Sequence, residues 1–329
     1  MTQARIGALA ATGAALFFGS SFVATAFALR SFGPLPVAFW RGLIAAILVG
    51  IALRAGWLGD DRPGVAEPRP GGGARSEVDR YARLVLLGLL GGPLFNIALN
   101  VAVGEAGATI TAFVAGLYAV LAAVLAPLVL RERLGSGALA GFIVALVGTG
   151  LLAELEAGAP SASGIATALF GAFSFAAYLV LSRRWSDAYR LRGGLIAEAN
   201  FVATSVVALG GILILGAGPI VPSSIEPVAA IAVLWLALGP GTAAQLLLVA
   251  SVRRIAARRS AAFLLLNPVT ATILAAILLA ERLSTQQLIG GALVLAGMAL
   301  ASGLITTLLG RDASQAAATA PAPQVPPAD

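Results

Sequence analysis

The sequence predicts an all-helical integral membrane protein, and three observations lead to this fold class. Of its 329 residues, 59% are hydrophobic and only 11% are charged, with a mean hydropathy of +0.95, whereas about a quarter of a soluble domain is charged. The apolar residues form long blocks, each near the ~20 residues that a helix needs to cross the ~30 Å hydrocarbon core. The charged residues lie between these blocks. The composition argues against a soluble enzyme, a disordered chain and, without cysteine, a disulfide-stapled secreted module.

Ten apolar segments are long enough to span a bilayer as helices, because barrel strands would be about half as long and would alternate in polarity. The first segment is too long for the core of a signal peptide and is preceded by a single Arg5, so we interpret it as a retained helix. In chain order the segments are 6–29, 34–53, 84–103, 108–130, 136–153, 163–182, 194–216, 228–252, 261–280 and 286–309.

Two regions are predicted to lie outside the membrane. Residues 55–81 are rich in glycine, proline and charge, which is typical of a flexible loop. The tail 311–329, with its Ala-Pro run, has too little apolar surface to pack and is predicted to be disordered. The predicted organisation is a first half over 1–154, a second half over 160–310 and this tail.

The basic residues are all arginine, and their distribution predicts the orientation of the chain. With ten helices, 18 of the 21 arginines fall on one side and only Arg30 and Arg282 on the other, while Arg41 lies within the second segment. Cytoplasmic loops carry the excess of basic residues, so both termini and the 55–81 loop are expected in the cytoplasm, with the protein in the cell (inner) membrane. The pI near 10.9 then follows from topology, and no nucleic-acid partner is expected.

The two halves of the chain are similar in sequence. Residues 118–151 align on 267–300 at a shift of 149, and residues near the start of each half align at a shift of 153. An odd number of helices per repeat forces the second repeat to enter the membrane upside down, an arrangement typical of secondary transporters. The matched residues include Glu132-Arg133-Leu134 with Glu281-Arg282-Leu283, Gly141 with Gly290, Gly148 with Gly297, and Ser21-Phe22 with Ser174-Phe175.

Four features together resemble the EamA family of the drug/metabolite transporter superfamily: Gly19-Ser20-Ser21-Phe22, Phe39-Trp40-Arg41, the repeated Glu-Arg-Leu and the glycine-rich fifth and tenth segments. The resemblance covers about residues 6–309. It implies a ten-helix carrier whose central cavity is formed by helices one to four and six to nine, with helices five and ten outside it. The family usually has proline in the fourth and ninth helices. Pro268 fits this pattern but Ala119 occupies the matching position, so we expect an asymmetric kink.

Helix breaks at matching places in the two halves indicate where a transporter site lies. The third segment contains Gly91-Gly92-Pro93 and the eighth contains Gly239-Pro240-Gly241, and proline loosens a helix by removing a backbone donor. The alignment then places Asn96 on Gln245. We expect both amides to line a cavity near the membrane midplane. The alternative is close helix packing, with Gly88 and Gly92 in a GxxxG spacing.

Two ionisable residues within predicted spans are candidates for gating or coupling. Arg41 lies roughly 10 Å into its helix, where it must pair, face water or extend to the surface. Glu105 and Glu281 are its candidate partners. Glu198 is the one carboxylate well inside a span, so it is either a proton carrier or a residue that reaches the cytoplasmic interface. Glu132 and Glu281 are expected to form structural ion pairs or helix caps.

The remaining polar residues of the spans complete the candidate substrate site, with packing as the alternative role for each. The candidates for substrate binding are Asn96, Gln245, Asn100, Tyr118, Tyr178, Asn200 and Asn267.

The sequence favours a carrier over two alternatives. An intramembrane enzyme would need a metal cluster, an activated nucleophile or paired carboxylates, and the chain has no His or Cys. A channel would show charged rings or a filter loop. We therefore predict a secondary transporter, not an enzyme, without cofactor or metal, acting as a monomer or homodimer in the lipid bilayer. The polar candidates suit a small polar or amphipathic metabolite, such as an amino acid or an analogue.

Overall fold

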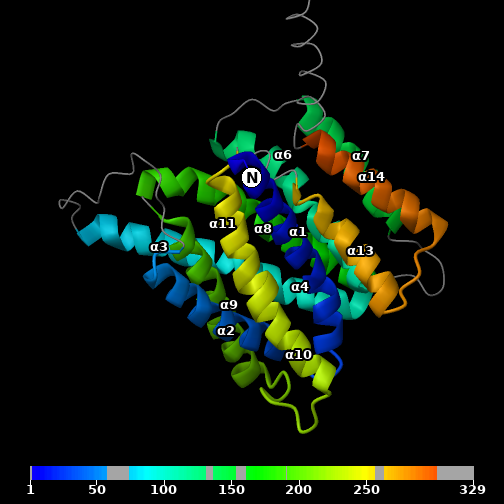
Figure 1. The fold of residues 1–329 in the computed structure, drawn as a ribbon, viewed down its shortest axis with the longest axis horizontal. Helices are drawn as coiled ribbons and strands as arrows, with labels where there is room; N and C mark the ends of the chain where they lie inside the picture. Colours follow the sequence, from blue (N-terminus) through cyan, green and yellow to red (C-terminus); the bar gives the residue numbers. More distant parts are fainter. Residues whose placement is uncertain are drawn as a thin grey trace, which may run out of the picture.

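The computed structural model describes residues 2–57, 74–130, 136–152, 161–189, 191–255 and 263–301, and this part of the chain is helical without any strand (Figure 1). Most of the predicted 55–81 loop, Glu132 and the predicted tail 311–329 lie outside the described residues. The first half contains α1 (Gln3–Ala28), α2 (Pro34–Arg54), α3 (Ala74–Gly91), α4 (Pro93–Ala106), α5 (Ala108–Gly116), α6 (Tyr118–Leu130) and α7 (Ser136–Leu152). The second half contains α8 (Ala162–Tyr189), α9 (Gly193–Leu215), α10 (Pro227–Leu236), the π-helix η1 (Ala237–Ala243), α11 (Ala244–Val252), α13 (Leu266–Leu278) and α14 (Thr285–Ala301).

The protein is a multi-pass membrane protein by the length and composition of its helices. Within the described residues, seven helical stretches are long and apolar enough to cross a bilayer, with α3–α4, α5–α6 and α10–α11 each counted as one. Three shorter apolar helices, Gly137–Leu152, Leu266–Leu278 and Thr285–Ala301, lie where the fifth, ninth and tenth spans are predicted. The count of ten spans stays a prediction.

The predicted loop 55–81 is too long at its C-terminal end, because α3 already begins at Ala74. Arg83 lies 3.6 Å from Asp79 one turn earlier in the helix, a spacing that stabilises helices. The Arg83 guanidinium also lies 4.0 Å from the centre of the Tyr189 ring, at the end of α8. Since α8 itself continues beyond the predicted end at 182, these contacts extend both helices past the predicted boundaries.

The third and the eighth predicted spans are interrupted at their glycine-proline sequences. These spans correspond to α3–α4 and to α10–α11. In the first half, Gly92 separates α3 from α4 with φ −96° and ψ −104°. In the second half, the interruption is the π-helix η1, with Pro240 inside it and Thr242 Oγ1 donating to the Ala237 carbonyl oxygen at 2.9 Å. A π-helix accommodates one extra residue per turn and often marks a functional site.

The fourth predicted span is interrupted at Leu117, and the described part of the ninth contains a turn close to the matching position; the asymmetric kink stays a prediction. Leu117 separates α5 from α6, and a turn at 264–265 precedes α13. Pro268 lies in the first turn of α13, where its missing N–H is tolerated. In the first half, the interruption follows Gly116 without a proline, and glycine is a poor helix former.

The glycines that match between the repeats form the contact between α7 and α14, which lie side by side at one edge of the molecule (Figure 1). A Cβ added at Gly141 would lie 2.5 Å from the Gly297 carbonyl oxygen, and one added at Gly148 would lie 2.6 Å from that of Gly290. Because Gly141 matches Gly290 and Gly148 matches Gly297, each glycine meets the counterpart of the other. This exchange is what a two-fold axis between inverted repeats requires.

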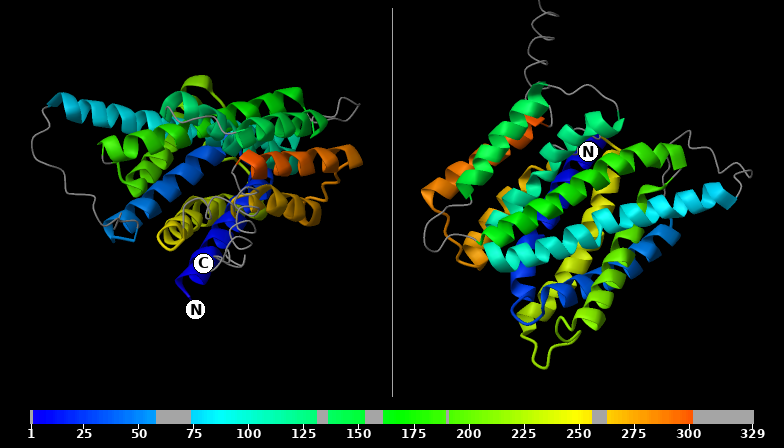
Figure 2. Two further views of the ribbon diagram at one scale, coloured as in Figure 1. Left: turned by 90° about the horizontal axis from the view of Figure 1, so that it is seen from above. Right: turned by 180° about the vertical axis from the view of Figure 1, so that it is seen from behind.

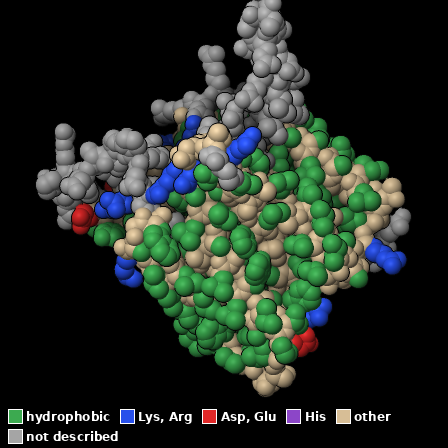
Figure 3. Space-filling model, viewed as in Figure 1, with side chains coloured by type: hydrophobic (Ala, Val, Ile, Leu, Met, Phe, Trp, Pro, Cys, Tyr) green, Lys and Arg blue, Asp and Glu red, His purple; other side chains and the backbone are tan. Residues whose placement is uncertain are grey.

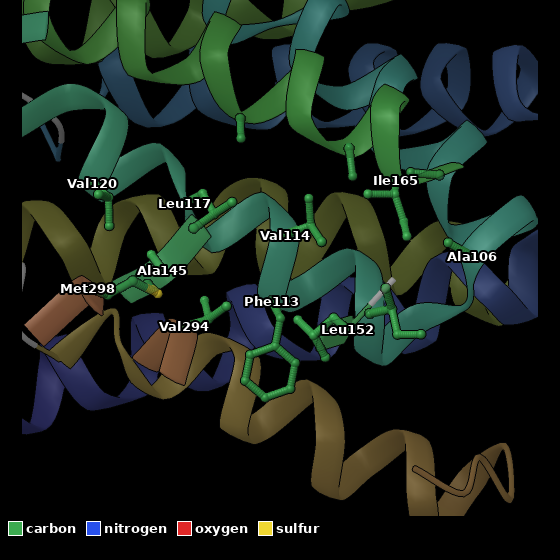
Figure 4. Close-up of a cluster of buried hydrophobic side chains, with 14 residues drawn as sticks. Ala106, Phe113, Val114, Leu117, Val120, Ala145, Leu152, Ile165, Val294 and Met298 are labelled. Atoms are coloured by element: carbon green, nitrogen blue, oxygen red, sulfur yellow. The ribbon is translucent and has the colours of Figure 1, made fainter. Parts of the chain in front are cut away.

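The other helices pack in pairs across the two halves. α2 packs against α9, α4 against α8, and α1 against α13 and α11; the view from behind in Figure 2 shows α8 beside the α3–α4 helix. A buried apolar cluster joins α5 and α6 to α7, α8 and α14 through residues such as Phe113, Val294 and Met298 (Figure 4).

The outer surface is apolar, as lipid contact requires. Leu213, Ile214 and Leu215 at the end of α9 are 71%, 82% and 75% exposed. In Figure 3 apolar side chains cover most of the visible face, and the basic side chains gather mainly toward its upper left.

Candidate substrate cavity

A cavity of about 470 Å³ lies between the two halves of the protein. Its wall receives side chains from interrupted helices of both repeats, which places broken backbone at a cavity, where the membrane tolerates it. Residues on the wall include Phe18, Ser21, Phe22, Arg41, Gly91, Phe95, Asn96, Leu99, Ala112, Gly116, Tyr118, Phe175, Tyr178, Asn200, Phe201, Pro240, Gln245, Leu248, Leu264, Leu265, Asn267, Pro268, Met298 and Ala301.

The structure brings most of the sequence candidates together at this wall. The matched amides Asn96 and Gln245 both line the cavity, from α4 and α11. That these residues bind a substrate stays a prediction. The other candidates on the wall are Arg41, Tyr118, Tyr178, Asn200 and Asn267, and, from the predicted breaks, Gly91, Pro240 and Pro268.

Two amides on the wall are held by backbone carbonyl groups near the break between α3 and α4. Asn96 Nδ2 donates to the Gly92 carbonyl oxygen at 2.9 Å, within its own helix. The Asn200 amide, oriented to satisfy its surroundings, donates to the carbonyl oxygens of Leu87 at 3.1 Å and Ile196 at 3.2 Å. These bonds fix the positions of the polar groups on one part of the wall.

An aromatic cluster forms another part of the wall. The rings of Phe95 and Phe175 are stacked with centres 4.4 Å apart, and Tyr118 meets Phe175 edge-on at 5.0 Å. The centre of the Tyr178 ring lies 5.2 Å from that of Phe175. The sequence analysis did not select the phenylalanines, although the repeat match of Phe22 with Phe175 contained the signal, because both line the cavity.

Arg41 lies on the cavity wall and is only 9% exposed. Its Nε has no hydrogen-bond partner, and none of the ion pairs within the described ranges includes this residue. The expected pairing with Glu105 or Glu281 is wrong for these conformations, since Glu105 accepts a hydrogen bond from Ser163 Oγ at 2.7 Å and Glu281 is occupied elsewhere.

Glu281 caps the start of α5, so the predicted role as a helix cap is confirmed. Its Oε1 accepts from the Ala108 N–H at 2.9 Å and its Oε2 from the Thr109 N–H at 3.1 Å. A carboxylate at a helix N-terminus satisfies free donors and favours the helix dipole. Since Glu281 follows α13 and α5 belongs to the first half, this bond connects the two repeats at their arginine-poor end.

Several candidates lie away from the wall. Asn100 is fully buried, and its Nδ2 donates to the Pro34 carbonyl oxygen at 3.0 Å, joining α4 to the start of α2. Glu198 packs against α2 instead, with Oε1 only 2.8 Å from where a Cβ of Gly50 would sit. Of the predicted break residues, Gly92, Pro93, Gly239 and Gly241 are not on the wall.

Helix α14, which lies where the tenth span is predicted, contributes to the cavity wall. This differs from the expectation that the fifth and tenth spans lie outside the cavity. Met298 and Ala301 line it. The Met298 side chain reaches this position because Gly116 leaves room for it, with Met298 Cε 3.1 Å from where a Cβ of Gly116 would be. The expectation holds for α7, from which no described residue lines the cavity.

The comparisons with known proteins agree with this architecture. The sequence model of the EamA-like transporter family matches residues 5–153 and 162–303, one match in each half. A solved structure titled "Crystal structure of protein" is similar in fold, with a TM-score of 0.61 and 21% identity over 93% of this chain and 98% of the other. No curated protein matches the chain.

Proposed function

Because the chain belongs to the EamA-like transporter family, and is therefore a membrane transporter of the drug/metabolite transporter type, we propose that it is a secondary carrier that moves a small metabolite across the cell membrane by alternating access. The observation that carries the proposal is the cavity between the halves, with Asn96 and Gln245 on its wall at matching positions. In this proposal the chain crosses the membrane ten times, with both termini in the cytoplasm.

The arrangement of the repeats supports alternating access. Rocking of one inverted repeat against the other exposes a fixed central site to each side in turn. In this structure, the hydrogen bonds from Glu281 to the start of α5 join the halves at the arginine-poor end. The cavity wall also includes Ala122, Leu248 and Ala301, and in the proposal the cavity opens toward the opposite, arginine-rich end. In this proposal, the conformation described above is the one closed at the arginine-poor face.

The wall favours a small amphipathic substrate, such as an amino acid or an analogue. The aromatic cluster of Phe95, Phe175, Tyr118 and Tyr178 offers apolar surface for stacking. The carboxamides and Arg41 offer hydrogen bonds to a polar part. Ligand sites generally combine mostly apolar walls with a few polar groups in this way.

Cysteine labelling tests the proposal, since the chain has no cysteine of its own. Gln245→Cys introduces a thiol on the wall, and Leu238→Cys, 52% exposed on the outside of the same span, is the matched control. Each variant is treated with a membrane-impermeant thiol reagent from either face of oriented vesicles. Glu281→Ala is then added to open the contact between the repeats.

A carrier should show opposite changes in labelling rate on the two faces. Each molecule is open to one face at a time, so a shift toward one open state lowers the fraction in the other. Glu281→Ala should speed labelling of Gln245→Cys from the arginine-poor face and slow it from the arginine-rich face, while Leu238→Cys stays unreactive throughout. Labelling that changes in the same direction on both faces would indicate a channel. Absence of labelling from either face would show that Gln245 is a packing residue.

A further inference from the structure

The electrostatics of the cavity wall are unbalanced. Among the described residues that line it, Arg41 is the only charged side chain, and no aspartate or glutamate accompanies it. Arg41 is 91% buried, by its 9% exposure, and its Nε faces no acceptor. The two carboxylates expected as partners are bonded to Ser163 and to the start of α5.

A buried cation without a counter-ion is unfavourable. Removing an ionised group from water costs several kcal/mol unless an opposite charge and hydrogen bonds compensate. Arginines within a membrane almost always pair or face a water-filled cavity. The guanidinium is a planar fork of five donors that fits a carboxylate with two parallel hydrogen bonds. An oxyanion that enters the cavity would therefore match the guanidinium of Arg41 in charge and in geometry.

A second unpartnered group lies on the same wall. Asn267 Oδ1 is buried without any hydrogen-bond donor among the described residues. A buried acceptor left unsatisfied is destabilising, so a ligand with a hydroxyl or N–H group gains a bond there. On the same wall, the stacked Phe95 and Phe175 rings present apolar surface.

We propose that the substrate is a small organic carboxylate, with its anionic group held by Arg41, its planar or apolar body against the Phe95–Phe175 stack and a hydrogen-bond donor at Asn267. This assignment rests on the proposed carrier function. The described wall carries no acidic side chain to pair with an ammonium group. The substrate is therefore a net anion, which narrows the amphipathic class proposed above to acids or amino-acid analogues without an ammonium group. A zwitterion of the same size binds less tightly because it leaves the charge of Arg41 uncompensated overall.

Ligand binding to the purified protein in lipid nanodiscs tests this assignment without requiring transport. The probes are phenylacetate, its uncharged amide phenylacetamide and the zwitterion phenylalanine, together with shorter carboxylate–amide pairs built on acetate and butyrate. Affinity is read from the ligand-induced rise in melting temperature. The variants are Arg41→Met, which removes the charge but keeps the length, and Arg41→Lys, which keeps the charge but loses the fork.

We expect at least one carboxylate to bind the wild type at least tenfold more tightly than its amide and than phenylalanine. Arg41→Met should bind acid and amide equally, and Arg41→Lys should retain part of the preference. Without ligand, Arg41→Met should melt no lower than the wild type, because it removes an uncompensated charge. Equal binding of acid and amide by the wild type, no binding of any carboxylate, or a less stable Arg41→Met protein would overturn the proposal.

The two proposals fail separately. The labelling of Gln245→Cys from each face does not depend on the charge of the substrate. Opposite changes on the two faces combined with no preference for carboxylates would leave the carrier intact and refute the anion site. A carboxylate preference without opposite changes would support the anion site and refute alternating access.

Discussion

Gly148→Ala should weaken the contact between α7 and α14 although it adds only one methyl group. The added Cβ would lie 2.6 Å from the Gly290 carbonyl oxygen and 2.8 Å from the Val294 nitrogen, both backbone atoms that a rotamer change cannot move. Reaching the ordinary contact distance of 3.4 Å requires the helices to separate by about 0.8 Å, the difference between the two distances. Overpacking of this kind costs about 1–3 kcal/mol.

Gly150→Ala is the matched control on the same helix. Nothing lies within 4 Å of a Cβ at this position, so the substitution acts only through helix propensity, where alanine is favoured over glycine by up to ~1 kcal/mol. The propensity gain is common to both variants and cancels, so they should differ in stability by the overpacking cost of about 1–3 kcal/mol although they make the same chemical change two residues apart.

The fraction of protein that remains monodisperse after heating in detergent, measured by size-exclusion chromatography, compares the variants under identical conditions. We expect the order Gly148→Ala, wild type, Gly150→Ala from least to most stable. Gly290→Ala should be destabilised like Gly148→Ala, since its Cβ would lie 2.7 Å from the Gly148 carbonyl oxygen. Equal stability of Gly148→Ala and Gly150→Ala would refute the close approach of the two helices.

Three further predictions concern the cavity, coupling and topology. Asn96→Leu and Gln245→Leu should fold normally but weaken transport of the substrate about tenfold each, the loss of one hydrogen bond of ~1.4 kcal/mol, and unchanged transport by either would show that its amide is not used. Glu198→Gln should abolish proton-driven uptake into vesicles but leave substrate exchange if Glu198 carries the proton, whereas full proton-driven uptake would assign it a structural role between α9 and α2. Topology reporters fused after Gly72 and at the tail should both report the cytoplasm, and activity of a periplasm-specific reporter at either point would contradict the predicted orientation.

Helix positions could be predicted from the sequence because the membrane thickness sets the number of apolar residues that a spanning helix needs. Each apolar block of that length therefore marks one helix. The segments predicted over 34–53 and 194–216 end within one residue of α2 and α9. The breaks could be located because glycine and proline act on the backbone locally, whatever surrounds them. The helix over 74–81 was missed because this sequence is charged and forms no apolar block. Arg83 contacts both Asp79 in the same helix and the Tyr189 ring of α8.

The rotation of each helix about its axis could not be predicted. In a soluble protein, polar residues mark the outer face, but here the lipid-facing and buried faces are both apolar, as exposed Leu213 and buried Ile212 on α9 illustrate. Asn96 and Asn100 lie one turn apart on α4, yet one lines the cavity and the other bonds Pro34. The alignment of the two halves identified a cavity-facing position only where both halves carry a polar residue, as with Asn96 and Gln245.

The π-helix η1 also sets the rotation of α11 about its own axis, and so which of its side chains face the cavity. A π-turn holds one residue more than an α-turn, and each residue of an α-helix adds about 100° of rotation. The extra residue therefore acts as a phase shift between α10 and α11. Deleting one residue within η1, such as Gly241, would turn α11 by about 100° relative to α10 and move Gln245 off the cavity wall. The sequence of α11 itself would be unchanged. In this span, the length of the chain selects which side chains reach the transport path.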